Sequence, residues 1–315
     1  MKPRLLKIAR LPTMLDHALL ASYEVVESDE DGTGLSEATA DIRALVANGE
    51  STVTRQLMAR LPALEIIVVF GVGYDGVDVE AARERGIEVT HTPDVLTDDV
   101  ADFAMALLLG IARNLRQADQ FTRSGAWTDG PFRFSRKVSG ARLGIIGLGR
   151  IGAAIARRAA GFDMHIAYTG RRPQAVDYAY YSTAAELAAN VDFLVVAVGG
   201  GASTYHLVDA QVLEALGPEG YLINVGRGSV VDEVAVAQAL AQGRLAGAAL
   251  DVYEHEPRPD PRLLLLENVI LTPHMASATL DTRQAMSSLV MANLEAWHNG
   301  TALPSPIPFT PSTSD

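Results

Sequence analysis

No cysteine occurs among the 315 residues of the chain. Disulfides, thiolate nucleophiles and thiolate metal sites are therefore excluded, and the composition fits a reducing compartment. We expect no metal cofactor.

Long apolar runs are also missing. The longest, Val100–Ala112, contains Asp102 and is too short to cross a bilayer. The first ten residues lack the apolar core and small-residue cleavage site of a secretory signal. We expect a soluble, cytoplasmic protein that does not bind membranes.

Basic residues are outnumbered. The 38 Asp and Glu residues exceed the 26 Lys and Arg residues, which gives a formal net charge of −12. A surface of this sign repels the phosphates of nucleic acids and anionic membranes, so we expect neither as a partner. Any anionic ligand must be bound by basic residues close to its site.

Apolar residues, 48% of the chain, fall into short β-rich runs that alternate with helical patterns. This alternation is typical of βαβ units, and the length favours two domains, so we expect an α/β fold with two doubly wound, Rossmann-like parallel sheets. The expected strands are 5–9, 42–46, 66–70 and 88–90 in one series, and 141–146, 165–168, 193–198, 221–225, 246–250 and 269–271 in the other.

Helical patterns and a biased tail complete this organisation. A long helix is expected over Asp99–Ser124, apolar on nearly every side and hence buried between domains or in a subunit interface. A last helix is expected over Asp281–His298. The Pro- and Ser-rich segment Pro304–Asp315 predicts either a poorly ordered terminus or a strap across the surface.

A glycine-rich turn follows the first strand of the second series. The turn is Gly147-Leu148-Gly149-Arg150-Ile151-Gly152, and a helical pattern follows it. Gly147 permits a tight turn, Gly149 lets backbone approach a pyrophosphate, and Gly152 allows close packing of the helix. The pattern alone also occurs in ordinary loops, but between a strand and a helix it predicts a dinucleotide site.

The next strand ends in Thr169-Gly170-Arg171-Arg172, where an NAD enzyme usually has an acidic residue for the ribose hydroxyl. One interpretation is a solvated basic turn. The other is that Gly170, Arg171 and Arg172 bind the 2′-phosphate of NADP(H), which makes NADP(H) the preferred cofactor and NAD(H) a secondary one.

Three later segments resemble the D-2-hydroxyacid dehydrogenase family, and within it the glyoxylate/hydroxypyruvate and hydroxyphenylpyruvate reductases. They are Asn224–Asp232, Leu250–Pro257 and Asn268–His274, in the family's order. The resemblance implies a discontinuous, flavodoxin-like substrate-binding domain of residues 1–97 and 285–315, and a dinucleotide-binding domain of residues 98–284, with substrate in the cleft between them.

The same resemblance implies that Arg227, Glu256 and His274 are catalytic. Arg227 suits the carboxylate and carbonyl of a 2-oxo acid, protonated His274 suits proton donation, and Glu256 favours the charged imidazole. Taken singly, each has an ordinary alternative: an ion pair, an exposed loop acid and a hydrogen-bonded turn histidine.

Further positions match the family less sharply. The resemblance implies that Val72 and Gly73 bind the substrate carboxylate through backbone N–H groups, and that Thr97, Val225, Gly226 and Asp251 contact the cofactor. Tight-turn or helix-capping roles are the alternatives for several of these. Trp127 and Phe132 lie in a loop that approaches the active site in related reductases, although core or interface packing is equally compatible. Gly199–Gly201 and Ala276 depart from the family pattern.

The sequence thus predicts NADPH-dependent reduction of small 2-oxo acids, glyoxylate or hydroxypyruvate, by a homodimer. The alternatives are a reductase of aromatic 2-oxo acids, and a regulator that senses dinucleotides without turnover.

Overall fold

The computed structural model describes residues 2–29, 31–32, 35 and 39–308. The chain folds into two compact units, Met1–Leu96 with Ala278–Asp315, and Thr97–Ser277. The sequence-based boundaries lay after residues 97 and 284, whereas the observed second boundary lies before α10 (Leu280–His298), so this helix belongs wholly to the first unit.

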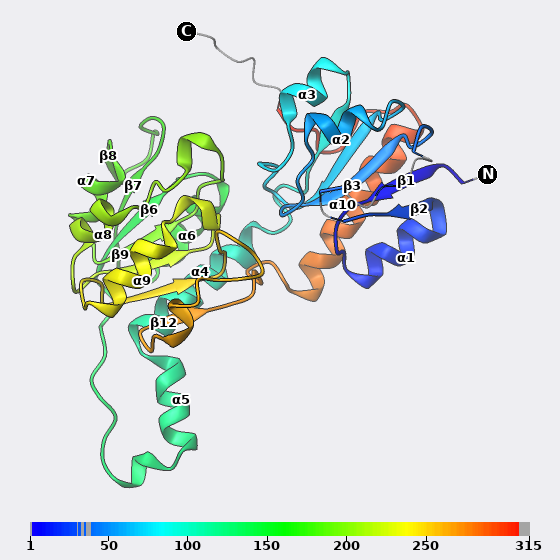
Figure 1. Cartoon of the computed structure of the whole chain (residues 1–315). Coiled ribbons are helices and arrows are strands. Elements are labelled where there is room, and N and C mark those ends of the chain that lie inside the picture. Colours follow the sequence, from blue (N-terminus) through cyan, green and yellow to red (C-terminus); the bar gives the residue numbers. More distant parts are fainter. Residues whose placement is uncertain (1, 30, 33–34, 36–38, 309–315) are drawn as a thin grey trace. The chain divides into compact units, whose positions relative to one another are not determined.

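The first unit is built on a five-stranded parallel sheet (Figure 1). Its strand order is β2 (Glu24–Glu27), β1 (Arg4–Lys7), β3 (Ala44–Asn48), β4 (Ile66–Phe70) and β5 (Glu88–Thr90). This order, 2-1-3-4-5, is the flavodoxin-like one. The helices are α1 (Thr13–Ser22), α2 (Arg55–Ala59), α3 (Val79–Glu84) and α10. Helix α1 packs on α10 and α2 packs on α3.

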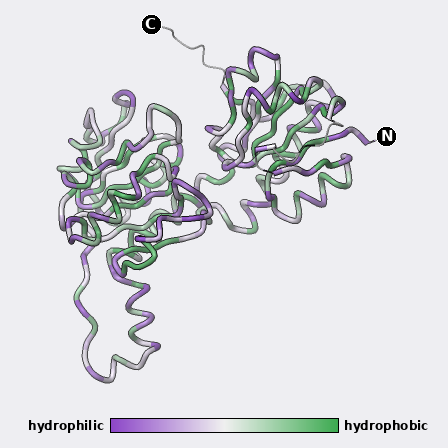
Figure 2. Tube along the Cα trace, viewed as in Figure 1, coloured by the Kyte–Doolittle hydropathy of each residue, from purple (hydrophilic) through white to green (hydrophobic). Residues whose placement is uncertain are grey.

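Strand β2 was not expected from the sequence. It has only four residues, Glu-Val-Val-Glu, at the edge of the sheet, and both glutamates are exposed. The buried strands give stronger patterns: every residue of β4 is buried. Figure 2 shows the hydrophobic residues concentrated along the strands of the unit.

The described part of the C-terminal tail is a strap on β5. Ile307 is buried, and its N–H donates to the carbonyl of Val89. Ser305 is also buried, where it donates through Oγ to the carbonyl of His91 (2.6 Å) and accepts from Nδ2 of Asn293 in α10 (2.8 Å). The strap interpretation therefore holds through Pro308, while residues 309–315 lie outside the described residues.

The second unit contains a seven-stranded parallel sheet (Figure 1). The strand order is β12 (Val269–Leu271), β11 (Gly247–Leu250), β10 (Tyr221–Asn224), β9 (Phe193–Val196), β6 (Arg142–Ile146), β7 (His165–Thr169) and β8 (Ala179–Tyr181). The strand order reverses between β6 and β9, which is the switch point where doubly wound sheets bind ligands. Six strands were expected; the missed β8 is a three-residue edge strand without a buried residue.

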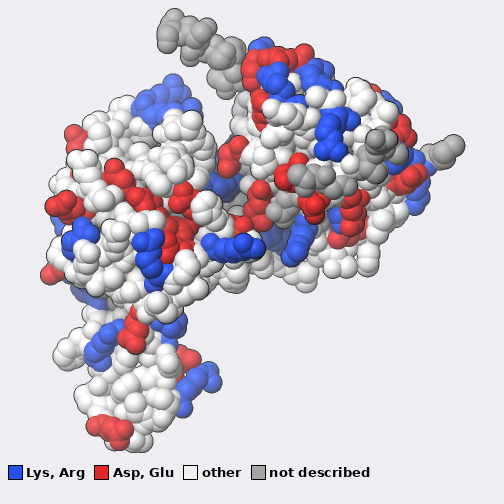
Figure 3. All heavy atoms as spheres, viewed as in Figure 1, with Lys and Arg blue, Asp and Glu red and all other residues white. Residues whose placement is uncertain are grey.

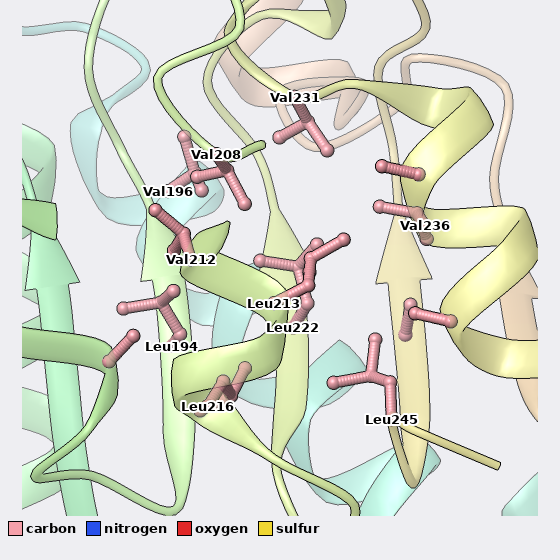
Figure 4. Packing of buried hydrophobic residues seen from close by; sticks show 14 of the residues in the cluster. Leu194, Val196, Val208, Val212, Leu213, Leu216, Leu222, Val231, Val236 and Leu245 are labelled. Carbon is pink, nitrogen blue, oxygen red and sulfur yellow. The ribbon is translucent and has the colours of Figure 1, made fainter. Parts of the chain in front are cut away.

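Most helices of this unit form two groups. Helix α4 (Thr97–Ala112) packs on α6 (Arg150–Ala160), while α7 (Ala184–Ala188), α8 (Ala210–Leu216) and α9 (Glu233–Ala241) pack in a row. Figure 4 shows Val212, Leu213 and Leu216 of α8 pointing at Leu194 and Leu222 of the sheet, within one buried cluster.

The expected single helix over Asp99–Ser124 is wrong. The chain forms α4 and then α5 (Leu115–Arg123), which are separated at Asn114, a residue with φ of 50°. Asparagine tolerates this left-handed conformation better than most residues. Most of α4 is buried as expected, but α5 has no buried residue. Residues 113–135, here called the arm, project from the unit in Figure 1 and close on the carbonyl of Ala112 through the N–H of Arg136.

Among the described residues, no helix combines the length and apolarity required to cross a membrane.

Candidate active site

The register of the second sheet brings the motifs to one edge. Thr169, Ile146, Val196, Asn224, Leu250 and Leu271 are successive partners across β7, β6, β9, β10, β11 and β12. Each is the last residue of its strand. The glycine turn, the arginine pair and the loops of Arg227, Glu256 and His274 therefore all start from this row.

The glycine turn has the geometry expected of a dinucleotide site. Gly147 has φ of +93°, and a Cβ there would lie 3.1 Å from the carbonyl oxygen of Ala197. A Cβ on Gly152 would lie 2.1 Å from the carbonyl oxygen of Gly147, so α6 packs directly on the turn. Gly149 faces open space, and no side chain caps the helix there. An open helix N-terminus of this kind suits a pyrophosphate.

The arginine pair lies beside this turn. The N–H of Gly147 donates to the carbonyl of Thr169 (3.0 Å), and Nε2 of Gln174 donates to the carbonyl of Leu148 (2.9 Å). Arg171 and Arg172 lie in the chain between Thr169 and Gln174, the two residues held by these hydrogen bonds, and both arginines are exposed. The space around Gly170 is open. The segment can therefore receive an additional phosphate next to the glycine turn.

The loop after β10 is held by Asn224, which the sequence analysis did not single out. Its buried amide accepts from the N–H of Gly226 (3.1 Å) and donates to the carbonyl of Arg227 (3.0 Å). A Cβ on Gly226 would lie 2.6 Å from the carbonyl oxygen of Val198, so Val225 and Gly226 run against the segment after β9. The guanidinium of Arg227 donates to the carbonyl of Gly226 (2.9 Å).

His274 and Glu256 form a direct pair. Nδ1 of the imidazole lies 2.7 Å from Oε2 of Glu256, whose Oε1 accepts from the N–H of Tyr253 (2.9 Å). Since a carboxylate stabilises the charged imidazole, the pair suits a histidine that donates a proton. His274 has φ of 50°, a conformation that few residues other than glycine adopt.

Asp251 organises the turn that carries His274. It is completely buried and accepts from Oγ1 of Thr272 (2.6 Å) and from the N–H groups of Met275 (2.9 Å) and Ala276 (2.8 Å). Burial raises the pKa of this carboxyl, and the three hydrogen bonds oppose that rise. The sequence predicts that Asp251 contacts the cofactor; in the structure its hydrogen bonds also fix the backbone on both sides of the histidine.

The loops of Arg227 and Glu256 meet through their backbones. A Cβ on Gly228 would lie 1.8 Å from the carbonyl carbon of Tyr253 and 2.3 Å from the nitrogen of Glu254. The hydroxyl oxygen of Tyr253 in turn lies 3.0 Å from the carbonyl oxygen of Leu250 and 2.9 Å from that of Thr272, so its one proton is shared between them. One buried tyrosine thus ties together the loops that carry Arg227, Glu256 and His274.

The remaining predicted residues lie elsewhere. Thr97 is the first residue of α4. Val72 and Gly73 lie in the first unit, where the carbonyl of Val72 is 2.8 Å from Nδ1 of His91. Trp127 is 67% exposed, which rules out a role in the core of this chain.

The two departures from the family pattern have local explanations. Gly201 has φ of +133°, and Oγ1 of Thr204 donates to the carbonyl of Gly199 (2.9 Å), so the triglycine segment forms a turn closed by Thr204. The side chain of Ala276 is buried and its N–H binds Asp251.

Comparisons with known proteins agree with this geometry. Residues 105–276 match the model of the D-isomer specific 2-hydroxyacid dehydrogenase, NAD binding domain. The chain is 49% identical over 282 residues to a glyoxylate/hydroxypyruvate reductase A of Arabidopsis thaliana, covering 89% of this chain and 90% of that protein. It is 48% identical over 267 residues to the hydroxyphenylpyruvate reductase of Plectranthus scutellarioides, covering 84% and 85%.

A solved structure is similar along nearly the whole chain. It is the NADPH-dependent glyoxylate/hydroxypyruvate reductase of Sinorhizobium meliloti in complex with NADP and malonate. The TM-score is 0.92 at 45% identity, with 98% of this chain and 97% of that chain covered.

The contact at Gly228 leads to the first prediction. We expect Gly228→Ala to lower the free energy of unfolding by about 1–3 kcal/mol, because the added methyl group overlaps backbone atoms that have no rotamer to escape to. Urea denaturation measures the loss. Gly130→Ala is the control, since a Cβ there meets no atom within 4 Å. Equal stability of the two variants would contradict the close approach.

Proposed function

Because the chain belongs to the D-isomer specific 2-hydroxyacid dehydrogenase family, we propose that it reduces small 2-oxo acids, glyoxylate or hydroxypyruvate, to 2-hydroxy acids with NADPH. The single observation that carries the proposal is the 2.7 Å contact between His274 and Glu256, on the sheet edge that also holds the glycine turn. A regulator without turnover has no need of this pair.

The residues divide the chemistry of a carbonyl reduction. The cofactor, when bound, supplies the hydride that goes to the carbonyl carbon of the substrate. Arg227 binds the carboxylate and the carbonyl oxygen, on which negative charge grows. His274 gives a proton from Nε2 to that oxygen, while Glu256 holds Nδ1 and stabilises the charged ring. Backbone N–H groups of Val72 and Gly73 are the proposed donors to the substrate carboxylate.

The second unit is the proposed dinucleotide-binding domain, and the first is the proposed substrate-binding domain. Gly147, Gly149, Arg150, Ile151 and Gly152 receive the pyrophosphate at the start of α6. Thr97, Val225, Gly226 and Asp251 are the proposed contacts to the remainder of the cofactor, and Gly170, Arg171 and Arg172 receive the 2′-phosphate. A cytoplasmic location belongs to the same proposal, since a chain without cysteine fits a reducing compartment.

Reduction of aromatic 2-oxo acids is the second candidate function. Its specific support is the 48% identity to a hydroxyphenylpyruvate reductase. The deciding assay follows the loss of NADPH absorbance with glyoxylate, hydroxypyruvate and hydroxyphenylpyruvate in parallel. Highest kcat/KM on the aromatic acid would replace the first candidate by the second, and turnover of none of them would favour a dinucleotide sensor.

The catalytic assignment predicts a separation of turnover from cofactor binding. We expect His274→Ala or Arg227→Ala to lower kcat by roughly 100-fold or more, because each removes a group that acts on the reacting oxygen. NADPH binding, measured by fluorescence, should stay close to that of the wild type. His165→Ala, which replaces an exposed histidine of the same unit, is the control.

For Glu256→Gln, reduction should fail at lower pH than in the wild type, since the charged ring of His274 loses its carboxylate partner. An unchanged profile contradicts the pairing.

The arginine pair predicts a preference for NADPH over NADH. Charge-assisted hydrogen bonds to the 2′-phosphate correspond to roughly ten- to hundred-fold discrimination. We expect the double variant Arg171→Ala with Arg172→Ala to lose this factor in kcat/KM with NADPH and to change little with NADH. Arg244→Ala, which removes an exposed arginine whose Nε donates to Oε1 of Gln242 (2.9 Å), is the control. A wild-type enzyme that uses NADH equally well would refute the assignment of the arginine pair to the 2′-phosphate.

We also propose a two-fold homodimer that pairs through the arm. Leu115, Trp127 and Phe134 are 64%, 67% and 102% exposed there. The ring centroids of Phe121 and Phe132 are 5.3 Å apart. These two rings line a hollow together with Ala118, Thr122 and Trp127. Figure 3 shows uncharged residues over most of the visible face of the arm. Exposed apolar surface gathered in this way is typical of an interface.

The dimer is tested by light scattering at micromolar concentration. We expect twice the mass of one chain for the wild type, and the mass of one chain for Trp127→Arg with Phe134→Arg, because two charges are then placed in apolar surface. Leu20→Arg, at a 55% exposed leucine of the first unit, should remain dimeric. A wild-type monomer, or a dimeric double variant, would remove the arm from consideration.

A further inference from the structure

We infer that Tyr205 and His206 are positioning residues: by hydrogen-bonding to Glu254 they fix the orientation of the Glu256 carboxylate toward His274. No sequence motif indicates this contact. The inference rests on the proposed function, because it takes Glu256 and His274 as the catalytic pair.

One carboxylate oxygen collects both contacts. Oε1 of Glu254 lies 3.0 Å from Oη of Tyr205 and 3.0 Å from Nε2 of His206. The two rings stack with centroids 4.0 Å apart and planes 15° apart, so each restricts the other. The hydrogen bond to Glu254 raises the pKa of Tyr205. We call these three residues the latch.

The latch is anchored on the segment that follows Arg227. The N–H of His206 donates to the carbonyl of Ser229 (2.9 Å), and the N–H of Val208 donates to the carbonyl of Val230 (2.9 Å). His206 has φ of 48°, a conformation rare outside glycine. Such backbone persists where surrounding contacts enforce it, and it is common at functional sites.

A second carboxylate holds the backbone of the same residue. The N–H of Glu254 donates to Glu233, whose other oxygen accepts from the N–H of Asp260 (3.0 Å). Glu233 is 5% exposed, at the start of α9. Glu254 is thus fixed through its side chain by Tyr205 and His206, and through its backbone by Glu233 of α9.

This attachment lies next to the catalytic pair. Tyr253, the residue before Glu254, donates its N–H to Oε1 of Glu256, and Oε2 of Glu256 contacts Nδ1 of His274 at 2.7 Å. Loss of the side-chain contacts of Glu254 therefore weakens the support of its neighbour Tyr253, whose N–H orients the Glu256 carboxylate. Because a displacement of about 1 Å can reduce a rate about 100-fold, a loosened loop should be visible in kcat.

The effect should also appear in the titration of His274. Within the second unit, the acidic groups that face this ring are Glu256, through the direct contact, and Asp251, through its charge. If Glu256 moves away, the charged ring is less stabilised, so His274 should lose its proton at lower pH. A residue that only supports the fold has no reason to change this titration.

The test compares Glu254→Ala, Glu254→Gln and Tyr205→Phe with wild type. For Glu254→Ala we expect a roughly ten-fold lower kcat and a KM for NADPH within about two-fold of wild type. The alkaline limb of the pH profile of kcat should be displaced to lower pH. Glu254→Gln retains an acceptor oxygen and Tyr205→Phe retains the stacked ring. The kcat and pH profile of both variants should therefore lie between those of wild type and Glu254→Ala. If Glu254→Ala does not fold, these two variants carry the test.

Glu186→Gln is the matched control. This glutamate accepts from Oγ of Ser182 (2.6 Å) and completes the capping box of α7 in the same unit, so the change removes a structural carboxylate of similar kind. It should lower Tm without moving the pH profile.

NMR titration of His274 supplies a readout that needs no turnover. A His274 midpoint displaced to lower pH in Glu254→Ala supports the latch even if no 2-oxo acid is reduced, in which case only the proposed function fails. An unchanged midpoint, together with a loss of Tm like that of Glu186→Gln, would overturn the positioning role.

Discussion

The parallel register of the seven-stranded sheet is the constraint on which the site depends. Ile146, Val196, Asn224, Leu250 and Leu271 end their strands in one row, so the backbone leaves the sheet five times at the same height. Residues more than a hundred positions apart then need only short loops to meet. A slip of one residue in any pairing would displace a whole loop and reverse the direction of its side chains.

This crowding explains why small residues recur at the strand ends. Gly147, Gly226 and Gly228 each lie where a Cβ would press on the backbone of the neighbouring loop. The loops consequently support one another, and the His274 turn can keep a backbone conformation that a lone loop would abandon. Positions in open space, such as Gly149, are different: there the absence of a side chain leaves room for a ligand.

Sequence reasoning predicts candidate site residues most directly where they are contiguous in the chain. The glycine turn, the arginine pair and the motifs around Arg227, Glu256 and His274 are each readable because neighbours in sequence share one loop. It failed where the signal is weak or distant. Strands β2 and β8 are too short and too exposed to show a period, and the break at Asn114 depends on one residue inside a helical pattern. The contacts of Tyr205 and His206 with Glu254 join separate loops, so only the fold reveals them.

The arrangement of charge explains how an acidic chain offers a site to anions. The carboxylates near the sheet edge are occupied by donors of the protein itself: Asp251 by Thr272 and two backbone N–H groups, Glu233 by two backbone N–H groups, and Glu256 by Tyr253 and His274. Acceptors already used in this way repel an incoming anion less, because their charge is spread over several dipoles. Arg171 and Arg172 are exposed, and the first turn of α6 adds its helix dipole, so positive charge lies next to the glycine turn. The effect of the net charge of −12 is long-range, and salt screens it over about 10 Å.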